Sequence, residues 1–334
     1  MSDELLLEVT GLHAYIGSPR GVVRAVDGVS FDLRRGEALG IVGESGSGKS
    51  VMARAIMGLM PARSDRTGTV LFRGRDLLGL SRKELEEVWG RQISMVFQDP
   101  GRSLNPVVRV ERQLTEGMRR HLGVSRSEAA SRALDLLKEV GVPDPERRLR
   151  AYPHELSGGM RQRVMIAVAL ACEPDLLIAD EPTTALDVTI QRQVLDLLRR
   201  VQTDRGMSLM LISHDLHVVA GRTDRTAVMY AGRIGEIGAS RTVFDEPRHR
   251  YTNALLAATP SIAHERHSPL NVIPGSLPSP TDPPPGCRFA PRCAAATEQC
   301  TAAQPALVPV GSDHAVACIH PVTENQKEGE LVGR

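Results

Sequence analysis

Residues 43–50 read Gly-Glu-Ser-Gly-Ser-Gly-Lys-Ser, which matches the phosphate-binding pattern G-x-x-x-x-G-K-[ST]. An apolar run at 38–42 precedes this octet, and a helical run at 51–59 follows it. This context predicts a strand, a turn and a helix whose positive dipole end faces the phosphates of a nucleotide. A plain Gly/Ser-rich turn is the alternative, and the flanking strand and helix argue against it.

The residue types of this octet, the phosphate loop, are those that nucleotide binding requires. Its glycines leave backbone N–H groups free to wrap phosphate oxygens. Lys49 can reach the β- and γ-phosphates, and the Ser50 hydroxyl can ligate Mg²⁺. We expect these residues to bind ATP: Gly43, Ser45, Gly46, Gly48, Lys49, Ser50 and Val51.

Bulk properties indicate a globular protein with a sizeable core, because 41% of residues are hydrophobic and 24% are charged. A net charge of +1 does not suggest a nucleic-acid-binding surface. The apolar run at 164–172 is far shorter than the ~20 residues that cross a bilayer. The opening Met-Ser-Asp-Glu does not resemble a secretory signal. We therefore expect a cytoplasmic protein that another subunit anchors if it works at a membrane.

The hydrophobic pattern predicts an α/β fold with a mostly parallel sheet. Apolar stretches at 5–9 and 22–33 predict an antiparallel hairpin, and runs at 70–72 and 93–97 predict further strands. Residues 108–152 have helical spacing and predict a helical insert. Beyond it, helices from about 159 and at 188–203 alternate with strands at 176–179, 208–212 and 226–229.

Two further segments carry chemistry. The apolar strand at 176–179 ends in Asp180-Glu181, where Asp180 is placed to hold Mg²⁺ and Glu181 to accept a proton from the attacking water. Leu156-Ser157-Gly158-Gly159 is a second glycine-rich turn before a helix, so it also presents N–H groups to an anion. One nucleotide does not need two such loops from one chain. A dimer in which Ser157, Gly158 and Gly159 close the partner's nucleotide site explains both.

Six motifs follow one another along the chain: the phosphate loop, Gln98 after a strand, Leu156-Ser157-Gly158-Gly159, the Asp180-Glu181 strand, Ala185-Leu186-Asp187, and His214. This order resembles the ATP-binding subunits of ABC transporters over roughly residues 5–240. The resemblance implies their fold: a phosphate-loop α/β core with an antiparallel β subdomain, a helical subdomain at about 105–157, and here a small Cys-rich C-terminal extension.

The resemblance also implies roles for single residues. Tyr15 corresponds to the aromatic residue that stacks on adenine, with an ordinary strand aromatic as the alternative. Gln98 corresponds to the residue that senses Mg²⁺ and the attacking water and relays to the membrane subunits. Asp187 corresponds to the residue that couples the two sites of the dimer, and His214 to the switch histidine on the γ-phosphate. With Glu181 and His214 both present, we expect hydrolysis by this subunit's own phosphate loop, with Lys49, Gln98, Glu181 and His214 as its catalytic residues.

Two regions resemble the ATPases of oligopeptide and dipeptide importers, closer to their D-type subunit. One is the segment 97–106, which in those proteins leads into the groove for the permease. The other is the tail, with Pro247-Arg248-His249-Arg250-Tyr251-Thr252, Ile273-Pro274-Gly275 and Cys287-Arg288-Phe289-Ala290-Pro291-Arg292-Cys293. Nine prolines between Pro260 and Pro291 predict an extended segment there. We expect an ATPase domain at 1–260, an extension at 261–322 and a flexible tail at 323–334.

Four cysteines lie in this extension: Cys287, Cys293, Cys300 and Cys318. Disulfides are disfavoured in a cytosolic protein, so clustered thiols suggest a metal site. Zinc ribbons bring paired C-x₂₋₄-C knuckles, which this spacing lacks, whereas the longer spacings suit a [4Fe–4S] cluster. The resembling peptide-importer subunits carry such a cluster, and zinc or unligated thiols are the alternatives. His314 and His320 flank Cys318 as further candidate ligands, or as solvated loop histidines.

The resemblance implies ATP hydrolysis that drives import of short peptides at the cytoplasmic face of the cell (inner) membrane. Its expected partners are a paralogous ATPase subunit (or a second copy of the chain), two transmembrane permease subunits and an external substrate-binding protein, but not a nucleic acid. Importers of nickel or glutathione are alternatives. So is a soluble ABC ATPase of DNA repair or translation, which the near-zero charge and an insert of ordinary length disfavour.

Overall fold

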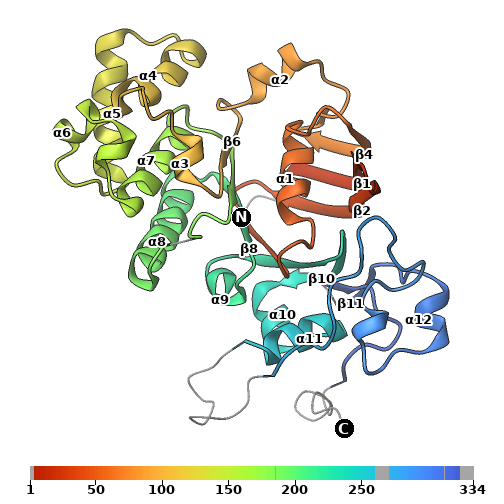
Figure 1. Ribbon diagram of the computed structural model, residues 1–334. Helices are drawn as coiled ribbons and strands as arrows, with labels where there is room; N and C mark the ends of the chain where they lie inside the picture. Colours follow the sequence, from red (N-terminus) through yellow and green to blue (C-terminus); the bar gives the residue numbers. More distant parts are fainter. Residues whose placement is uncertain (1–3, 185, 260–270, 312, 324–334) are drawn as a thin grey trace. The chain divides into compact units, whose positions relative to one another are not determined.

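The computed structural model describes residues 4–184, 186–259, 271–311 and 313–323 (Figure 1). The chain divides into two compact units. The first unit contains Met1–Leu6, Leu33–Ala38 and Gly79–Ile212, and the second unit contains Leu7–Asp32, Leu39–Leu78 and Ser213–Arg334. Ala185 of the predicted Ala-Leu-Asp motif and residues 324–334 of the predicted tail lie outside the described residues. The predicted limits of the ATPase domain and the extension stay predictions.

In the second unit, the predicted N-terminal hairpin is part of an antiparallel sheet in the order β2-β1-β4-β5. These strands are β1 (Leu5–Ser18), β2 (Gly21–Arg34), β4 (Ser64–Phe72) and β5 (Arg75–Asp76). Along β1, Leu12 and Ala14 are buried whereas Tyr15 is half-buried, as expected of a sheet with one face on the core. The β1–β4 register shifts between Thr10 and His13, where Gly11 adopts a φ of 55°.

The second unit also contains strands β3 (Ala38–Val42), β9 (Arg225–Tyr230), β10 (Arg233–Ala239), β11 (Val308–Gly311) and β12 (His314–Val316). β3 pairs in parallel with β9, and β9, β10, β12 and β11 then pair antiparallel in that order. The helices of this unit are α1 (Lys49–Met57), α9 (Leu216–Val219), α10 (Ser240–Asp245), α11 (Arg250–Ala257), the 3₁₀ helix η2 (Ala290–Arg292) and α12 (Glu298–Ala302). The C-terminal segment, defined here as the described residues from 271 onward, therefore adds strands to a sheet rather than only extended chain.

The first unit is built on three parallel strands in the order β8-β7-β6: β6 (Ile93–Val96), β7 (Leu176–Asp180) and β8 (Ser208–Ser213). Every residue of these strands is buried, which is why they read as continuous apolar runs rather than alternating ones. Its helices are α2 (Arg82–Val88), α3 (Pro100–Ser103), α4 (Val110–His121), α5 (Arg126–Glu139), α6 (Pro145–Arg150), the 3₁₀ helix η1 (Pro153–Glu155), α7 (Gly158–Leu170) and α8 (Val188–Arg205). The predicted α/β class is confirmed.

Candidate nucleotide site

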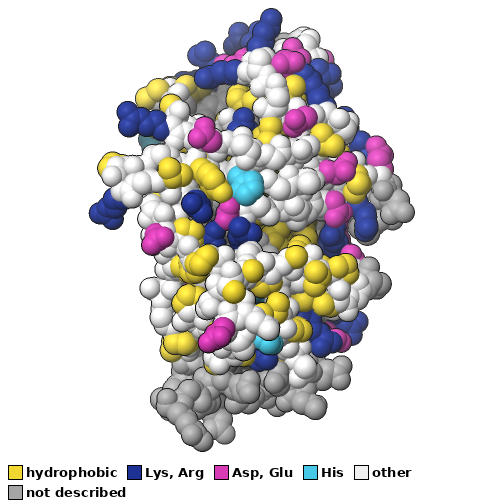
Figure 2. All heavy atoms as spheres, turned by 90° about the vertical axis from the view of Figure 1, so that its right-hand side faces the viewer, with side chains coloured by type: hydrophobic (Ala, Val, Ile, Leu, Met, Phe, Trp, Pro, Cys, Tyr) yellow, Lys and Arg dark blue, Asp and Glu magenta, His cyan; other side chains and the backbone are white. Residues whose placement is uncertain are grey.

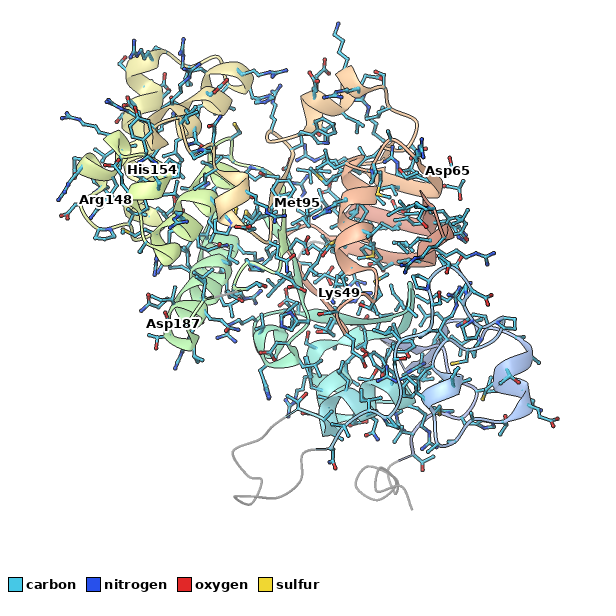
Figure 3. The ribbon with its side chains drawn as sticks, in the orientation of Figure 1. Lys49, Asp65, Met95, Arg148, His154 and Asp187 are labelled. Carbon is cyan, nitrogen blue, oxygen red and sulfur yellow. The ribbon has the colours of Figure 1, made fainter. Side chains whose placement is uncertain are left out.

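The phosphate loop lies between β3 and α1, as its sequence context predicts. Lys49 begins α1 and is 4% exposed (Figure 3). Its Nζ donates hydrogen bonds to the carbonyl oxygens of Gly43 at 2.7 Å and Glu44 at 3.0 Å, and so spans the loop. The loop also closes on itself through the bond from the Ser47 N–H to the Glu44 carbonyl. The Lys49 ammonium is thus held by two backbone carbonyl groups of the loop.

Glycine is required in this loop for two different reasons. Gly43 and Gly48 have φ values of 150° and 103°, and a Cβ would lie 2.0 Å from the Met229 carbonyl oxygen at Gly43 and 2.2 Å from that of Ala25 at Gly48. At Gly46, with φ 84°, a Cβ would meet nothing within 4 Å. Gly43 and Gly48 therefore permit close packing below the loop. Gly46 keeps the exposed side open, as a phosphate group needs.

In the first unit, the predicted general base and Gln98 are brought together. The Nε2 of Gln98 donates a hydrogen bond to Oε2 of Glu181 at 2.9 Å, and the Thr184 hydroxyl donates to the same oxygen at 3.0 Å. Glu181 has a φ of 47°, in the left-handed region that is costly for a residue with a side chain. Asp180 is 1% exposed at the end of β7. This strand end carries a carboxylate whose direction is set by two donors and by a strained backbone.

The turn at Ser157 and the start of the helix after it lie beside the start of α8. The Ser157 hydroxyl caps α7 by accepting from the N–H of Met160 at 3.3 Å, and Asp187 caps α8 by accepting from the N–H of Ile190 at 3.0 Å (Figure 3). A Cβ on Gly159 would lie 3.0 Å from Cγ2 of Ile190, so the two helix starts are close. Gly158 and Gly159 thus sit at an α7 N-terminus that is exposed or half-exposed.

Tyr15 is held by a buried carboxylate. Its hydroxyl donates to Oδ1 of Asp27 at 2.6 Å, and burial together with this hydrogen bond raises the pKa of Tyr15. Asp27 is 4% exposed and also binds Arg233 at 2.9 Å and Arg288. His13 lies beside Tyr15, with the two rings edge-on and their centroids 5.6 Å apart. The ring of Tyr15 is therefore fixed on the sheet while its side chain stays half-buried.

The remaining predicted residue, His214, is exposed and directly follows β8. Sequence reasoning missed Thr184 and Asp27. Thr184 lies three residues after Glu181, and that spacing is a weak signal for a donor to its carboxylate. The partners of Asp27 lie as far as 261 positions away, so no local pattern could reveal them.

The expected [4Fe–4S] cluster on Cys287, Cys293, Cys300 and Cys318 is wrong, and so is its zinc alternative. In the part of the chain that the structure describes, which includes all four cysteines, no group of three or more His, Cys, Asp or Glu side chains is arranged to hold a metal ion. Burial raises the pKa of the Cys287, Cys293 and Cys318 thiols, so these side chains are neutral near pH 7. The cysteines are free thiols packed in the C-terminal segment.

The two candidate histidine ligands have other partners. Nε2 of His314 lies 2.7 Å from Oε1 of Glu236, and both side chains are buried. His320 is bound to the Thr297 hydroxyl at 3.0 Å. His314 therefore stabilises the pairing of β12 with β10 rather than a metal, and the loop-histidine alternative is wrong for this buried residue.

The surface carries both signs of charge. On the face drawn in Figure 2, Lys and Arg side chains lie among Asp and Glu side chains, with hydrophobic side chains between them. Among the described residues, no helix combines the length and the apolar character that crossing a membrane requires.

Family models match both parts of the chain. A model described as ABC transporter matches residues 26–184, which include the phosphate loop and the Asp180-Glu181 strand end. A second model, described as the C-terminal region of oligopeptide/dipeptide transporters, matches residues 236–300.

Curated relatives are similar along nearly the whole chain. A probable peptide ABC transporter ATP-binding protein of Sinorhizobium fredii is 50% identical over 317 residues, which cover 94% of this chain and 95% of the relative. The dipeptide transport ATP-binding protein DppD of Bacillus subtilis is 48% identical, with 94% of each chain covered. The DppD protein of Escherichia coli is 47% identical, over 96% of this chain and 98% of the relative.

Solved structures with the same fold are ATP-binding cassettes. One is a dimeric ATP-binding cassette in a post-hydrolysis state bound to ADP and Pi, with a TM-score of 0.64 and 28% identity over 70% of this chain and 99% of that chain. Another is cbiO1 from Clostridium perfringens, described as part of an ABC transporter complex, with a TM-score of 0.61 and 30% identity over 73% and 92%. The chain therefore belongs to the ABC transporter family, as one of its ATP-hydrolysing, ATP-binding proteins.

Proposed function

We propose that this ATPase powers the uptake of short peptides, dipeptides or oligopeptides, through a membrane permease. The observation that carries this proposal is the pairing, in one chain, of the phosphate loop with a C-terminal region of the oligopeptide/dipeptide transporter type. The relatives named for peptide or dipeptide transport align over both parts. Uptake of nickel or glutathione is the alternative within the same family.

In the proposed binding mode, the phosphate-loop residues bind the triphosphate and Tyr15 stacks on adenine. In the structure, the Lys49 ammonium donates to the Gly43 and Glu44 carbonyls. In the proposed mode it turns toward the β- and γ-phosphates and offsets their negative charge. The open side at Gly46 supports this mode, because a phosphate oxygen meets no side chain there. His214 contacts the γ-phosphate.

The Mg²⁺ that accompanies ATP fits the chemistry of three residues: the Ser50 hydroxyl, the Asp180 carboxylate and the Gln98 amide oxygen are the hard oxygen donors that it prefers. When bound, the ion neutralises charge that develops on the β- and γ-phosphates. Glu181 accepts a proton from the attacking water. Gln98 and Thr184 both donate to Oε2 of Glu181, and these two bonds hold its carboxylate in one orientation.

Two ATPase subunits are proposed to face each other, with Ser157, Gly158 and Gly159 of one contacting the γ-phosphate on the other. The capped helix start at Ser157 supports this, since its N–H groups form an anion-binding end. Asp187, beside it at the start of α8, would couple the two sites. The partner is a paralogous ATPase or a second copy of the chain.

The permease is proposed to dock on the first unit, next to Gln98. A pocket lined by Val107, Arg109, Arg112 and Tyr152 follows the segment that begins at Gln98, and the Arg109 guanidinium lies 5.6 Å from the centre of the Tyr152 ring. The lining is mainly polar and carries more arginines than acidic side chains, which suits a permease segment with acidic side chains. The assembly would place this protein at the cytoplasmic face of the membrane, with a substrate-binding protein outside.

Reconstitution tests the proposal. The chain, its permease subunits, the partner ATPase and the binding protein would be placed in proteoliposomes, and ATP-dependent uptake of a labelled dipeptide measured against labelled nickel and glutathione. We expect dipeptide uptake that disappears with Lys49→Ala. Uptake of nickel or glutathione instead of peptide would contradict the substrate class. Tight binding of duplex DNA at moderate salt, without any permease partner, would favour the DNA-repair alternative.

A further inference from the structure

The C-terminal segment reaches the phosphate loop through one arginine. The Nη1 of Arg292 lies 3.1 Å from Oε1 and 3.0 Å from Oε2 of Glu44, the second residue of the loop. The Arg292 side chain is 6% exposed and that of Glu44 is 25% exposed, so water screens this ion pair weakly. A surface pair of this kind would contribute little, but a buried arginine is costly to leave without its partner.

The guanidinium of Arg292 is fixed by the rest of the same segment. Its Nε donates to the carbonyl of Pro274 at 2.8 Å and its Nη2 to that of Ile273 at 3.2 Å. Nη1 also lies 3.2 Å from the hydroxyl of Tyr230 on β9. Because the three guanidinium nitrogens are all engaged, Arg292 is a rigid link between the C-terminal segment and Glu44.

Glu44 is also held through its backbone. Its N–H donates to the hydroxyl of Tyr251, a fully buried residue of α11, at 2.9 Å. Its carbonyl accepts from Nζ of Lys49 at 3.0 Å. The bond to Arg292 therefore adds a side-chain attachment to the backbone attachments of Glu44, the residue that joins Gly43 to the exposed part of the loop. Loss of the bond between Arg292 and Glu44 would let Glu44 turn and would change the direction of the neighbouring backbone N–H groups.

A second arginine of the same segment contacts the other end of the candidate nucleotide site. Arg288 binds Oδ2 of Asp27, and both side chains are 6% exposed. Oδ1 of the same carboxylate accepts the Tyr15 hydroxyl at 2.6 Å. Arg24, three residues before Asp27 on β2, donates its N–H to the carbonyl of Pro280, so the segment is also attached to the sheet by its backbone.

We infer that the C-terminal segment positions the nucleotide site for ATP, with Arg292 acting through Glu44 on the phosphate loop and Arg288 acting through Asp27 on Tyr15. This inference rests on the proposed ATP-binding roles of the loop and of Tyr15. Both arginines are positioning residues, because neither is proposed to touch ATP. Holding the loop and the ring in place before ATP arrives lowers the entropy cost of binding.

Binding of Mg-ATP to the whole chain, measured by titration calorimetry, tests the inference. We expect Arg292→Gln and Arg288→Gln each to weaken binding about 10-fold, which corresponds to about 1.4 kcal/mol. The matched control is Arg205→Gln, which removes a part-buried bond to Glu139 (Nε to Oε1, 3.0 Å) elsewhere in the first unit and should leave ATP affinity unchanged. Thermal unfolding without nucleotide reports any general loss of stability.

Double variants separate the two routes from a merely structural effect. If Arg292 acts through Glu44, the pair Arg292→Gln with Glu44→Gln should bind ATP no more weakly than Arg292→Gln alone. In a Tyr15→Ala background, Arg288→Gln should lose its effect while Arg292→Gln keeps it. Arg292→Lys, which keeps the charge but loses the fork of donors, should fall between wild type and Arg292→Gln.

Two patterns of results overturn the inference. One is wild-type affinity in Arg292→Gln and Arg288→Gln. The other is a loss of affinity that matches the loss in unfolding temperature and also occurs in Arg205→Gln. Lys49→Ala distinguishes this failure from that of the proposed function. If wild type binds ATP and Lys49→Ala does not, unchanged arginine variants refute the positioning role alone. If Lys49→Ala binds like wild type, the proposed role of the loop fails first.

Discussion

The side-chain amide of Gln98 donates a 2.9 Å hydrogen bond to the carboxylate of Glu181, although the two residues are 83 positions apart. Both follow parallel, paired strands, β6 and β7, and the carboxyl ends of such strands meet at one edge of the sheet. The proposed general base and the residue proposed to sense the attacking water are thus linked by a direct hydrogen bond.

Glu181→Gln should keep ATP binding and lose hydrolysis. The amide has a similar shape but cannot accept the proton from water, so turnover should fall by roughly 10² to 10⁴. The measurement is phosphate release by the assembled complex, with ATP affinity determined in parallel. Glu139→Gln is the control, because Glu139 pairs with Arg205 away from the strand end. Undiminished phosphate release in Glu181→Gln would refute the general-base role.

Lys49→Ala should abolish measurable ATP binding, because it removes the ammonium that spans Gly43 and Glu44. Lys138→Ala removes an exposed lysine that lies 3.8 Å from Glu146, and should bind ATP like wild type. Fluorescent nucleotide titration compares the two variants. Equal affinities would mean that the ammonium of Lys49 is not needed for binding.

Gly48→Ala should destabilise the protein more than its backbone angle alone explains. A Cβ at Gly48 would lie 2.2 Å from the Ala25 carbonyl oxygen, whereas at Gly21, which has a similar φ of 113°, it would meet nothing within 4 Å. We expect a loss of about 1 kcal/mol in Gly21→Ala from strain, and roughly 3 kcal/mol or more in Gly48→Ala from strain and clash together. Urea unfolding measures both. Similar losses in the two variants would contradict the close packing below the loop.

Stability should fall as the pH is lowered from about 6.5 to 4, and His249 should account for part of the fall. Burial lowers the pKa of His249 to about 4, while its Nδ1 accepts a hydrogen bond from the Tyr251 N–H at 3.0 Å and therefore carries no proton. An unfolded histidine titrates near 6.5, so in this window the unfolded chain binds a proton that the folded chain does not. The contribution of neutral His249 to the free energy of unfolding is fully present above pH 6.5 and is lost as the pH falls toward 4. It amounts to roughly 3 kcal/mol at most.

His249→Gln should flatten this pH dependence, because glutamine can still accept the Tyr251 N–H but does not titrate in this range. Urea unfolding at several pH values between 4.5 and 7 measures the slope. His217→Gln replaces an exposed histidine and should keep the wild-type slope. A slope that is the same in all three proteins would show that His249 does not bind the proton in question.

Local pattern was sufficient for the phosphate loop and the strands around it. The buried strands at 93–96, 176–180 and 208–213 lie where apolar runs predict strands, and α7 and α8 lie where helices are expected, from about 159 and at 188–203. β10 was missed because Gly235, Glu236 and Gly238 interrupt its apolar pattern. Glu236 is 0% exposed and satisfied by His314 and by two backbone N–H groups, which only the tertiary structure supplies.

Longer-range relationships could not be predicted from spacing. Four cysteines in a short segment suggested a metal cluster, but their number says nothing about the direction of their side chains. The bond from Arg292 to Glu44 joins residues 248 positions apart, and neither stands out by type or pattern. The sequence therefore pointed to the groups proposed to act on phosphate, but not to the side chains that hold those groups in place.

Pairing of β12 with β10 makes the last described strand part of a sheet. A shortened version of this protein that ends soon after the ATPase motifs would lose β12. The edge of β10 would then expose unpaired backbone N–H and C=O groups, which can pair with strands of other chains. The truncation would also remove His314, the partner of the buried Glu236 carboxylate. Trimming the tail to obtain a minimal ATPase for crystallisation or inhibitor screening should thus yield aggregates, and such work is best done with residues kept through 323.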